Sequence, residues 1–134
     1  MKKTVHVMVG VIWGKSERAK SILLAKRPDH LHQGGLWEFP GGKLEQGEEP
    51  RDALSRELKE ELDIELLAAS PLMDVSHDYG DKAVFLDIWQ VNDFKGQEQG
   101  LEGQELRWVP LVELDQYAFP AANVAIVERL QQLL

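Results

Sequence analysis

The chain has 134 residues, of which 43% are hydrophobic and 28% are charged, and this composition indicates one globular domain over 1–134. Its formal net charge of -8 excludes loose binding to a nucleic acid backbone, which needs a basic surface. Cysteine is absent, so disulfide bonds, thiolate zinc sites and a cysteine nucleophile are excluded too. We therefore expect that an acidic domain of this kind handles phosphates only through a bridging metal ion.

The N-terminal half begins with two apolar runs that predict strands. Residues 4–13 are rich in Val and Ile, and His6 interrupts the run, so we expect a first strand and not a signal peptide. No apolar run reaches membrane length, which predicts a cytoplasmic chain without membrane contact. Residues 21–27 predict a second strand, which we expect to pair with the first as a hairpin. A loop over 28–35 and a short apolar stretch over 36–40 follow.

The C-terminal half predicts three more strands and a last helix. Residues 71–91 contain two strand-like runs with a turn at 79–81, and a polar, Gly-rich loop spans 92–104. Residues 105–111 predict the last strand. Helical spacing then joins four apolar residues, Val124, Val127, Leu130 and Leu134. Strands on both sides of a central helix, with a second helix at the C-terminus, predict an α/β sandwich around a mixed sheet.

The central helix has a clear start and a clear buried face. Pro50 suits the first turn, where its missing N–H would be unpaired in any case. Leu54, Leu58 and Leu62 follow each other at intervals of four residues, which predicts an apolar stripe against the core.

Three glutamates, Glu57, Glu60 and Glu61, cluster on a neighbouring face of this helix. Like charges at such spacing cost a few tenths of a kcal/mol per pair. A divalent cation such as Mg²⁺ would reverse this effect, because it binds carboxylate oxygens together with waters and substrate phosphates. A solvated acidic helix face is the alternative that these three residues leave open.

The segment around this helix resembles the Nudix box, G-x5-E-x7-R-E-U-x-E-E-x-G-U, in which U is a bulky aliphatic residue. Gly42, Glu48 and the run "RELKEELDI" (56–64) match this pattern, except that Asp63 replaces the usual glycine. We expect Asp63 to take a left-handed backbone conformation after the helix and to point away from Glu57 and Glu61. The departure is then a tolerated defect in stability with no part in metal binding.

The resemblance extends to the MutT type of Nudix hydrolase over nearly the whole chain. "LWEFPGGKLEQGE" resembles the approach to the box in that group, and "GLEGQELRWVPL" resembles its loop with a further metal-binding glutamate. "FPAANVAIVERL" resembles its C-terminal helix, whose asparagine reads the base. The motifs outside the box are less specific, and CTP-preferring relatives look much alike.

This resemblance implies the Nudix fold, a mixed β-sheet between helices (α/β/α), and a metal-dependent activity. The implied reaction is cleavage of a nucleoside triphosphate to the monophosphate and pyrophosphate with Mg²⁺, or with Mn²⁺. The leading substrate is 8-oxo-dGTP, whose removal prevents mutation, and CTP or 5-methyl-dCTP is the alternative. A non-catalytic Nudix binding module is a third reading, against which the intact carboxylates and the lack of a fused domain weigh. The resemblance is compatible with a monomer or a homodimer.

The resemblance also implies roles for individual residues. The implied metal ligands are Gly41 through its carbonyl, Glu57, Glu60, Glu61 and Glu102, with Glu98 and Glu105 as competitors for the last place. Glu57 is also the candidate general base, oriented by Arg56, although Arg56 could form a simple helix-surface salt bridge. Glu102 could instead activate water.

The implied nucleotide contacts are Arg27, Phe39, Lys43, Asp81, Lys82 and Asn123. Asn123 can both donate and accept hydrogen bonds, which suits a purine edge, and it could instead cap the last helix. Lys82 stands where arginine is frequent, so a forked contact there is in doubt. The sequence further predicts that Trp37, Trp89 and Trp108 belong to the core and that His6 and His77 are strand residues.

Overall fold

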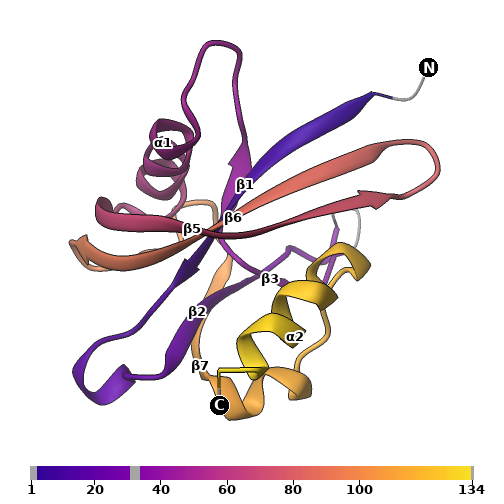
Figure 1. The fold of residues 1–134 in the computed structure, drawn as a ribbon. Coiled ribbons are helices and arrows are strands. Elements are labelled where there is room, and N and C mark those ends of the chain that lie inside the picture. Colours follow the sequence, from indigo (N-terminus) through magenta and orange to yellow (C-terminus); the bar gives the residue numbers. More distant parts are fainter. Residues whose placement is uncertain (1–2, 31–33, 134) are drawn as a thin grey trace.

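The computed structural model describes residues 3–30 and 34–133, and its strands form two sheets between two helices (Figure 1). The first sheet has the order β4-β1-β6-β5, and its strands are β1 (Thr4–Ile12), β4 (Gly41–Lys43), β5 (Glu65–Asp78) and β6 (Ala83–Lys95). The second sheet has the order β3-β2-β7, and its strands are β2 (Ser21–Lys26), β3 (Trp37–Glu38) and β7 (Glu105–Pro110). The helices are α1 (Pro50–Leu62) and α2 (Val124–Gln131), and short 3-10 helices occur at Ser16–Arg18, Leu111–Gln116 and Ala121–Asn123.

Strand β1 is buried on both faces and separates two apolar cores. Val9 and Val11 belong to the core that includes α2, whereas Met8 and Ile12 belong to the core beneath α1. Because successive strand residues point to opposite faces, the part of β1 between the two cores needs apolar residues on both faces, and its buried half, Met8 to Ile12, meets this requirement. β1 also pairs parallel with β6 and antiparallel with β4, so the predicted mixed sheet with helices on both sides is present.

The predicted hairpin between residues 4–13 and 21–27 is wrong. β2 pairs antiparallel with β3 and β7, and a single bridge between Trp13 and Ile22 connects it to the end of β1. The physical reason is that β4 and β6 already occupy both edges of β1. β2 therefore builds a second sheet, in which Leu23 faces the α1 core while Ile22 and Leu24 face the α2 core.

The hairpin of β5 and β6 is longer than the sequence predicts. β5 begins at Glu65, which pairs with Lys95 at the far end of β6, so both strands extend beyond the predicted range of 71–91. The register shifts between Pro71 and Met73, and β5 is an edge strand, where a proline is tolerated. The predicted turn at 79–81 is confirmed, and the Tyr79 N–H donates to the Lys82 carbonyl at 2.8 Å.

The apolar stripe of α1 is confirmed, since Leu54, Leu58 and Leu62 are all 0% exposed. The stripe predicted for α2 is partly wrong, because Val124 is 46% exposed and the buried residues are Ile126, Val127 and Leu130. At about 100° per residue, Val124 lies across the helix from Ile126. Leu134 lies outside the described residues, as do positions 31–33 of the predicted loop over 28–35.

The tryptophans and histidines lie largely as predicted. Trp37 is buried, and Trp89 and Trp108 pack partly buried against the α1 core. His6 lies in β1 and His77 in β5. Neither helix in the described part of the chain is both long enough and apolar enough to span a bilayer.

Asp63 ends α1 in the predicted left-handed conformation, with φ of 59° and ψ of 37°. Its N–H donates to the Lys59 carbonyl at 3.1 Å, and its carboxylate pairs with the Lys59 ammonium at 2.8 Å on the surface. The ion pair offsets part of the backbone cost, since exposed pairs of this kind contribute a few tenths of a kcal/mol.

We predict that Asp63→Gly raises the free energy of unfolding by about 0.5–1 kcal/mol, because glycine takes the left-handed conformation without steric cost. Urea unfolding of the variant would measure this, and Lys59→Ala is the control that removes the ion pair alone. A less stable Asp63→Gly protein would show that the carboxylate does more than the backbone argument allows.

Candidate active site

Two adjacent glycines allow β4 to lie close to its neighbours, Gly41 to β1 and Gly42 to α1. Gly41 has a φ of +153°, and a Cβ at this position would collide with the Met8 carbonyl oxygen on β1. A Cβ on Gly42 would occupy the place of the Glu57 carboxylate. The Gly41 N–H donates to Glu61 Oε2 at 3.1 Å, so the Gly-Gly pair contacts two of the clustered glutamates.

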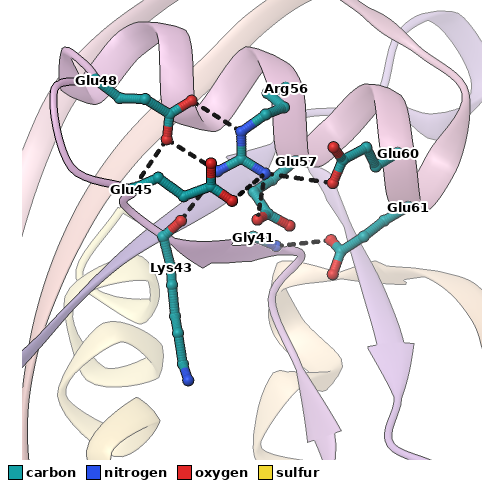
Figure 2. A network of polar contacts seen from close by, with 8 residues as sticks. All are labelled: Gly41, Lys43, Glu45, Glu48, Arg56, Glu57, Glu60 and Glu61. Atoms are coloured by element: carbon teal, nitrogen blue, oxygen red, sulfur yellow. Dashed lines mark hydrogen bonds and ion pairs between the residues drawn. The ribbon is translucent and has the colours of Figure 1, made fainter.

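Arg56 is the centre of a hydrogen-bonded network that joins α1 to the loop before it (Figure 2). Its Nε and Nη2 atoms donate to the two oxygens of Glu48 at 2.8 and 2.9 Å, a bidentate contact. Nη2 also donates to the Lys43 carbonyl at 3.1 Å, and Nη1 donates to Glu57 Oε1 at 2.9 Å. Arg56 is thus more than a helix-surface salt bridge, because it fixes the Glu57 carboxylate against the loop over 41–48.

Arg56 and its carboxylate partners shift each other's pKa. Hydrogen bonds from Arg56 lower the pKa of Glu48 to about 2, and the same contacts raise the pKa of Arg56. Glu60 accepts a weaker hydrogen bond from Arg56 at 3.3 Å, and its side chain is 58% exposed. The sequence pattern contains Glu48 as part of the box, but its part in fixing Arg56 becomes visible only in the structure.

Glu61 is the most perturbed carboxylate of the cluster. Burial raises its pKa from the ordinary 4.5 to about 8, and the Gly41 N–H opposes this shift. The nearby carboxylates of Glu102, Glu57 and Glu38 raise it further. Burial and the neighbouring carboxylates thus both oppose the charged form of Glu61, which a nearby cation would favour.

Glu57 is perturbed in the same direction. Burial raises its pKa, and the neighbouring charges of Glu60 and Glu102 add to this, while the hydrogen bond from Arg56 opposes it. The hydrogen bond from Arg56 thus holds the Glu57 carboxylate in one orientation, despite repulsion from the other carboxylates.

The carboxylate oxygens suit a divalent metal ion, although they do not already surround a single position. In the described part of the chain, no three His, Asp or Glu side chains already surround a place where a cation could bind. The groups present are carboxylate oxygens, which hard divalent cations prefer. Arg56, the cation beside them, is already engaged by Glu48. A divalent ion would offset the burial and the mutual repulsion that together raise the pKa of Glu61 and Glu57.

A cavity of about 480 Å³ lies beside the carboxylates. Of the predicted site residues, its walls include Arg27, Phe39, Gly41, Lys43, Glu61, Glu102 and Asn123. Glu57 and Glu60 are not among the residues that line it, and both accept hydrogen bonds from Arg56. The Lys43 side chain extends away from the Arg56 network (Figure 2). The fold thus brings together residues from β2, β4, α1, the loop before β7 and the start of α2.

Asp81 and Lys82 lie in the turn between β5 and β6. Lys82 lines a smaller cavity of about 150 Å³, which shares Arg27 and Asn123 with the larger one. Asp81 is exposed and lines neither of these two cavities.

Asn123 occupies the N-cap position of α2 without acting as a cap. Its backbone is helical, with φ of -89° and ψ of -12°, and its side chain makes no capping hydrogen bond within the described chain. Asn123 lines both cavities. Phe39 is 5% exposed and stacks on Phe119 at 5.6 Å between ring centroids, so it belongs to the core and to the cavity wall.

The structure separates Glu102 from its two competitors in sequence. Glu98 accepts hydrogen bonds from Trp108 at 2.7 Å and from Arg18 at 3.1 Å. Glu105 pairs with Arg107 at 2.7 Å. Glu102 lines the main cavity and acts electrostatically on the carboxylates of α1.

Glu38 is a site residue that the sequence analysis misses. It lies on β3, pairs with Arg27 at 3.2 Å and lines both cavities. Burial raises its pKa, and Arg27 opposes the shift. The signal that could have revealed it is an acidic side chain inside the apolar stretch "LWEFP".

A model of the NUDIX domain matches residues 8–129. The chain belongs to the Nudix hydrolase family. Members of this family depend on a divalent metal ion, which agrees with the carboxylate cluster.

Relatives of known name cover almost all of this Nudix chain. It is 39% identical to a CTP pyrophosphohydrolase of Escherichia coli, over 98% of this chain and 94% of that protein. It is 34% identical to an 8-oxo-dGTP diphosphatase of Escherichia coli, over 98% of this chain and 99% of that protein. A solved MutT structure, from a comparison of Aliivibrio salmonicida and Vibrio cholerae, superposes with a TM-score of 0.86 at 36% identity, over 98% of this chain and all of that one.

We predict that the metal-free protein loses stability as the pH rises, because of Glu61. Its pKa of about 8 in the folded state exceeds the ordinary 4.5, so between these values the folded state binds more protons than the unfolded state. This contribution is fully present below the unfolded pKa and is lost as the pH rises through the folded pKa.

The melting temperature in EDTA should therefore fall by roughly 5 °C between about pH 6 and about pH 9, and Glu61→Gln should reduce that fall. Glu128→Gln, on the exposed side of α2, is the matched control and should behave as the wild type. An undiminished fall in Glu61→Gln would show that another group causes it.

Proposed function

We propose that this single domain is a nucleoside triphosphate pyrophosphohydrolase that uses Mg²⁺, or Mn²⁺, and prefers 8-oxo-dGTP. The observation that carries the proposal is one cavity lined by Glu61 and Glu102 and also by Asn123, whose side chain does not cap its helix. One cavity then offers a place for the phosphates beside the carboxylates and a polar group for the base. The identity to an 8-oxo-dGTP diphosphatase over nearly the full length supports this reading.

The chemistry of the amide favours the oxidised base. Guanine presents two acceptors, N7 and O6, on the edge that a side chain can read. 8-Oxoguanine carries a hydrogen on N7 and so presents a donor beside the O6 acceptor. The carbonyl and NH₂ groups of Asn123 match this donor-acceptor pair, whereas N7 of guanine would face the carbonyl oxygen.

In this proposal the metal is held by the carboxylates of Glu57, Glu60, Glu61 and Glu102 and by the Gly41 carbonyl. When bound, a divalent ion neutralises phosphate charge and makes a water more acidic. Arg56 fixes the Glu57 carboxylate at 2.9 Å, and burial raises the pKa of Glu57 towards that of an effective base. Glu57 therefore accepts the proton of the attacking water, with Glu102 as the alternative base.

The remaining predicted residues contact the nucleotide in this proposal. The ring of Phe39 contacts the base, and Lys43, at the end of β4, binds a phosphate. Arg27 lies between the two cavities beside Glu38, and Asp81 and Lys82 approach the nucleoside from the β5–β6 turn. The products are the nucleoside monophosphate and pyrophosphate. Clearing 8-oxo-dGTP from the nucleotide pool is a cytoplasmic task that avoids mutation without contact with DNA.

A second candidate is a pyrimidine nucleotide such as CTP or 5-methyl-dCTP. The 39% identity to a CTP pyrophosphohydrolase favours it, and an asparagine amide can also pair with a cytosine edge, which offers a donor on N4. A binding module without turnover is the third possibility.

A nucleotide screen separates these functions. The expected result is the highest kcat/KM for 8-oxo-dGTP among 8-oxo-dGTP, dGTP, CTP and 5-methyl-dCTP, with Mg²⁺ present and with pyrophosphate and monophosphate both measured. A higher value for CTP would favour the second candidate. Tight nucleotide binding without turnover would identify a binding module.

We predict that Glu57→Gln and Glu60→Gln each lower kcat by at least about 100-fold, because a neutral amide replaces a charged ligand or base. Circular dichroism should show an intact fold in both variants, and Glu128→Gln should retain wild-type kcat. Wild-type turnover by either variant at saturating Mg²⁺ would contradict the proposed metal site.

We also predict that Asn123→Ala weakens kcat/KM for 8-oxo-dGTP by about 10-fold or more while dGTP changes much less, since a buried polar partner contributes about 1–3 kcal/mol. Val124→Ala, an exposed neighbour, is the control. An equal loss for both nucleotides would mean that Asn123 supports the helix and does not read the base.

A further inference from the structure

The loop that carries Glu102 caps the helix that carries Glu61. The last carbonyls of an α-helix have no donor within the helix, so they need partners from elsewhere. The Leu62 carbonyl accepts the Gln99 N–H at 2.9 Å, and the Glu61 carbonyl accepts the Leu101 N–H at 3.0 Å. The C-terminal end of α1 and the loop between β6 and β7 are therefore one hydrogen-bonded unit.

The Gln104 side chain closes this unit by bridging the two glutamates through their backbones. Its Nε2 donates to the Glu61 carbonyl oxygen at 3.2 Å. Its Oε1 accepts the Glu102 N–H at 2.9 Å. The side chain is half-buried and lines the main cavity, and a Cβ on Gly100 would collide with the Gln104 carbonyl oxygen, so the loop is tightly folded around it.

We propose that Gln104 is a positioning residue that orders the Glu102 loop for metal binding, an inference that rests on the proposed function of Glu102 as a metal ligand. The Glu102 side chain is exposed, so its own packing does not fix it. An unordered loop would lose conformational entropy when Glu102 joins the metal, and the Gln104 amide removes much of that cost in advance. Such supporting groups typically change metal affinity or activity by about 10- to 100-fold.

The amide chemistry explains why the residue is glutamine and not glutamate. The bridge needs one donor, for the Glu61 carbonyl, and one acceptor, for the Glu102 N–H. A carboxylate keeps the acceptor but loses the donor. It also adds a negative charge to a cluster in which neighbouring carboxylates already repel one another.

The test compares Gln104→Ala and Gln104→Glu with Gln99→Ala. Gln99 is in the same loop, its side chain is exposed, and its contact with Leu62 uses the backbone N–H, which the substitution keeps. Mn²⁺ affinity is measured from the electron paramagnetic resonance signal of free Mn²⁺. Gln104→Ala should weaken binding by about 10-fold. Gln104→Glu should weaken it less, because it keeps the acceptor for the Glu102 N–H and its charge attracts the cation, and Gln99→Ala should match the wild type.

A double-mutant cycle shows whether Gln104 acts through Glu102 or only supports the fold. In the Glu102→Gln background, Gln104→Ala should have almost no further effect on Mn²⁺ affinity. The same fold-loss in both backgrounds would overturn the inference.

Hydrogen exchange of the metal-free proteins gives a second readout that needs no turnover. Exchange of the Glu102 amide should accelerate in Gln104→Ala and not in Gln99→Ala. An active wild type with unchanged Mn²⁺ affinity in Gln104→Ala would overturn the role of Gln104 alone. A wild type that binds no Mn²⁺ would overturn both this role and the proposed function.

Discussion

Arg56 donates two hydrogen bonds to Glu48 and one to Glu57, so a single guanidinium joins the Gly-Gly loop to α1. Without this contact, the loop over 41–48 would have no charged attachment to the helix among the described interactions. At the same junction, the Gly41 N–H donates to Glu61. The two glycines permit the close approach, and the arginine maintains it. The geometry of the carboxylates therefore depends on a contact that does not itself face the cavity.

The site is costly for the fold that carries it. Burial and mutual repulsion raise the pKa of Glu61 and Glu57, which means that the charged forms destabilise the metal-free protein. The fully buried stripe of Leu54, Leu58 and Leu62 offsets this cost on the neighbouring face of the same helix. The leucine face of α1 thus stabilises the fold, and its carboxylate face destabilises it. This is expected where ligand binding requires groups that oppose folding.

The sequence predicts what depends on local spacing and misses what depends on distant neighbours. The stripe of α1 follows from helix geometry. The Nudix box identifies Arg56 and the glutamates by pattern, and its usual glycine indicates the left-handed conformation of Asp63. The partner of β2 cannot be predicted in this way, because it depends on β4 and β6 occupying the edges of β1. Glu38 is missed for the same reason, since only the pairing of β2 with β3 brings it beside Arg27 and into the cavity.

We propose that the carboxylates of α1 and Glu102 hold one or more divalent ions beside the cavity. Anomalous diffraction from crystals grown with Mn²⁺ and a non-hydrolysable analogue of 8-oxo-dGTP tests it most directly, because it locates the metal itself. We expect anomalous density within coordination distance of Glu57, Glu61 and Glu102, with the phosphates of the analogue as further ligands. Density found only elsewhere on this acidic surface, with these carboxylates free of metal, would contradict it.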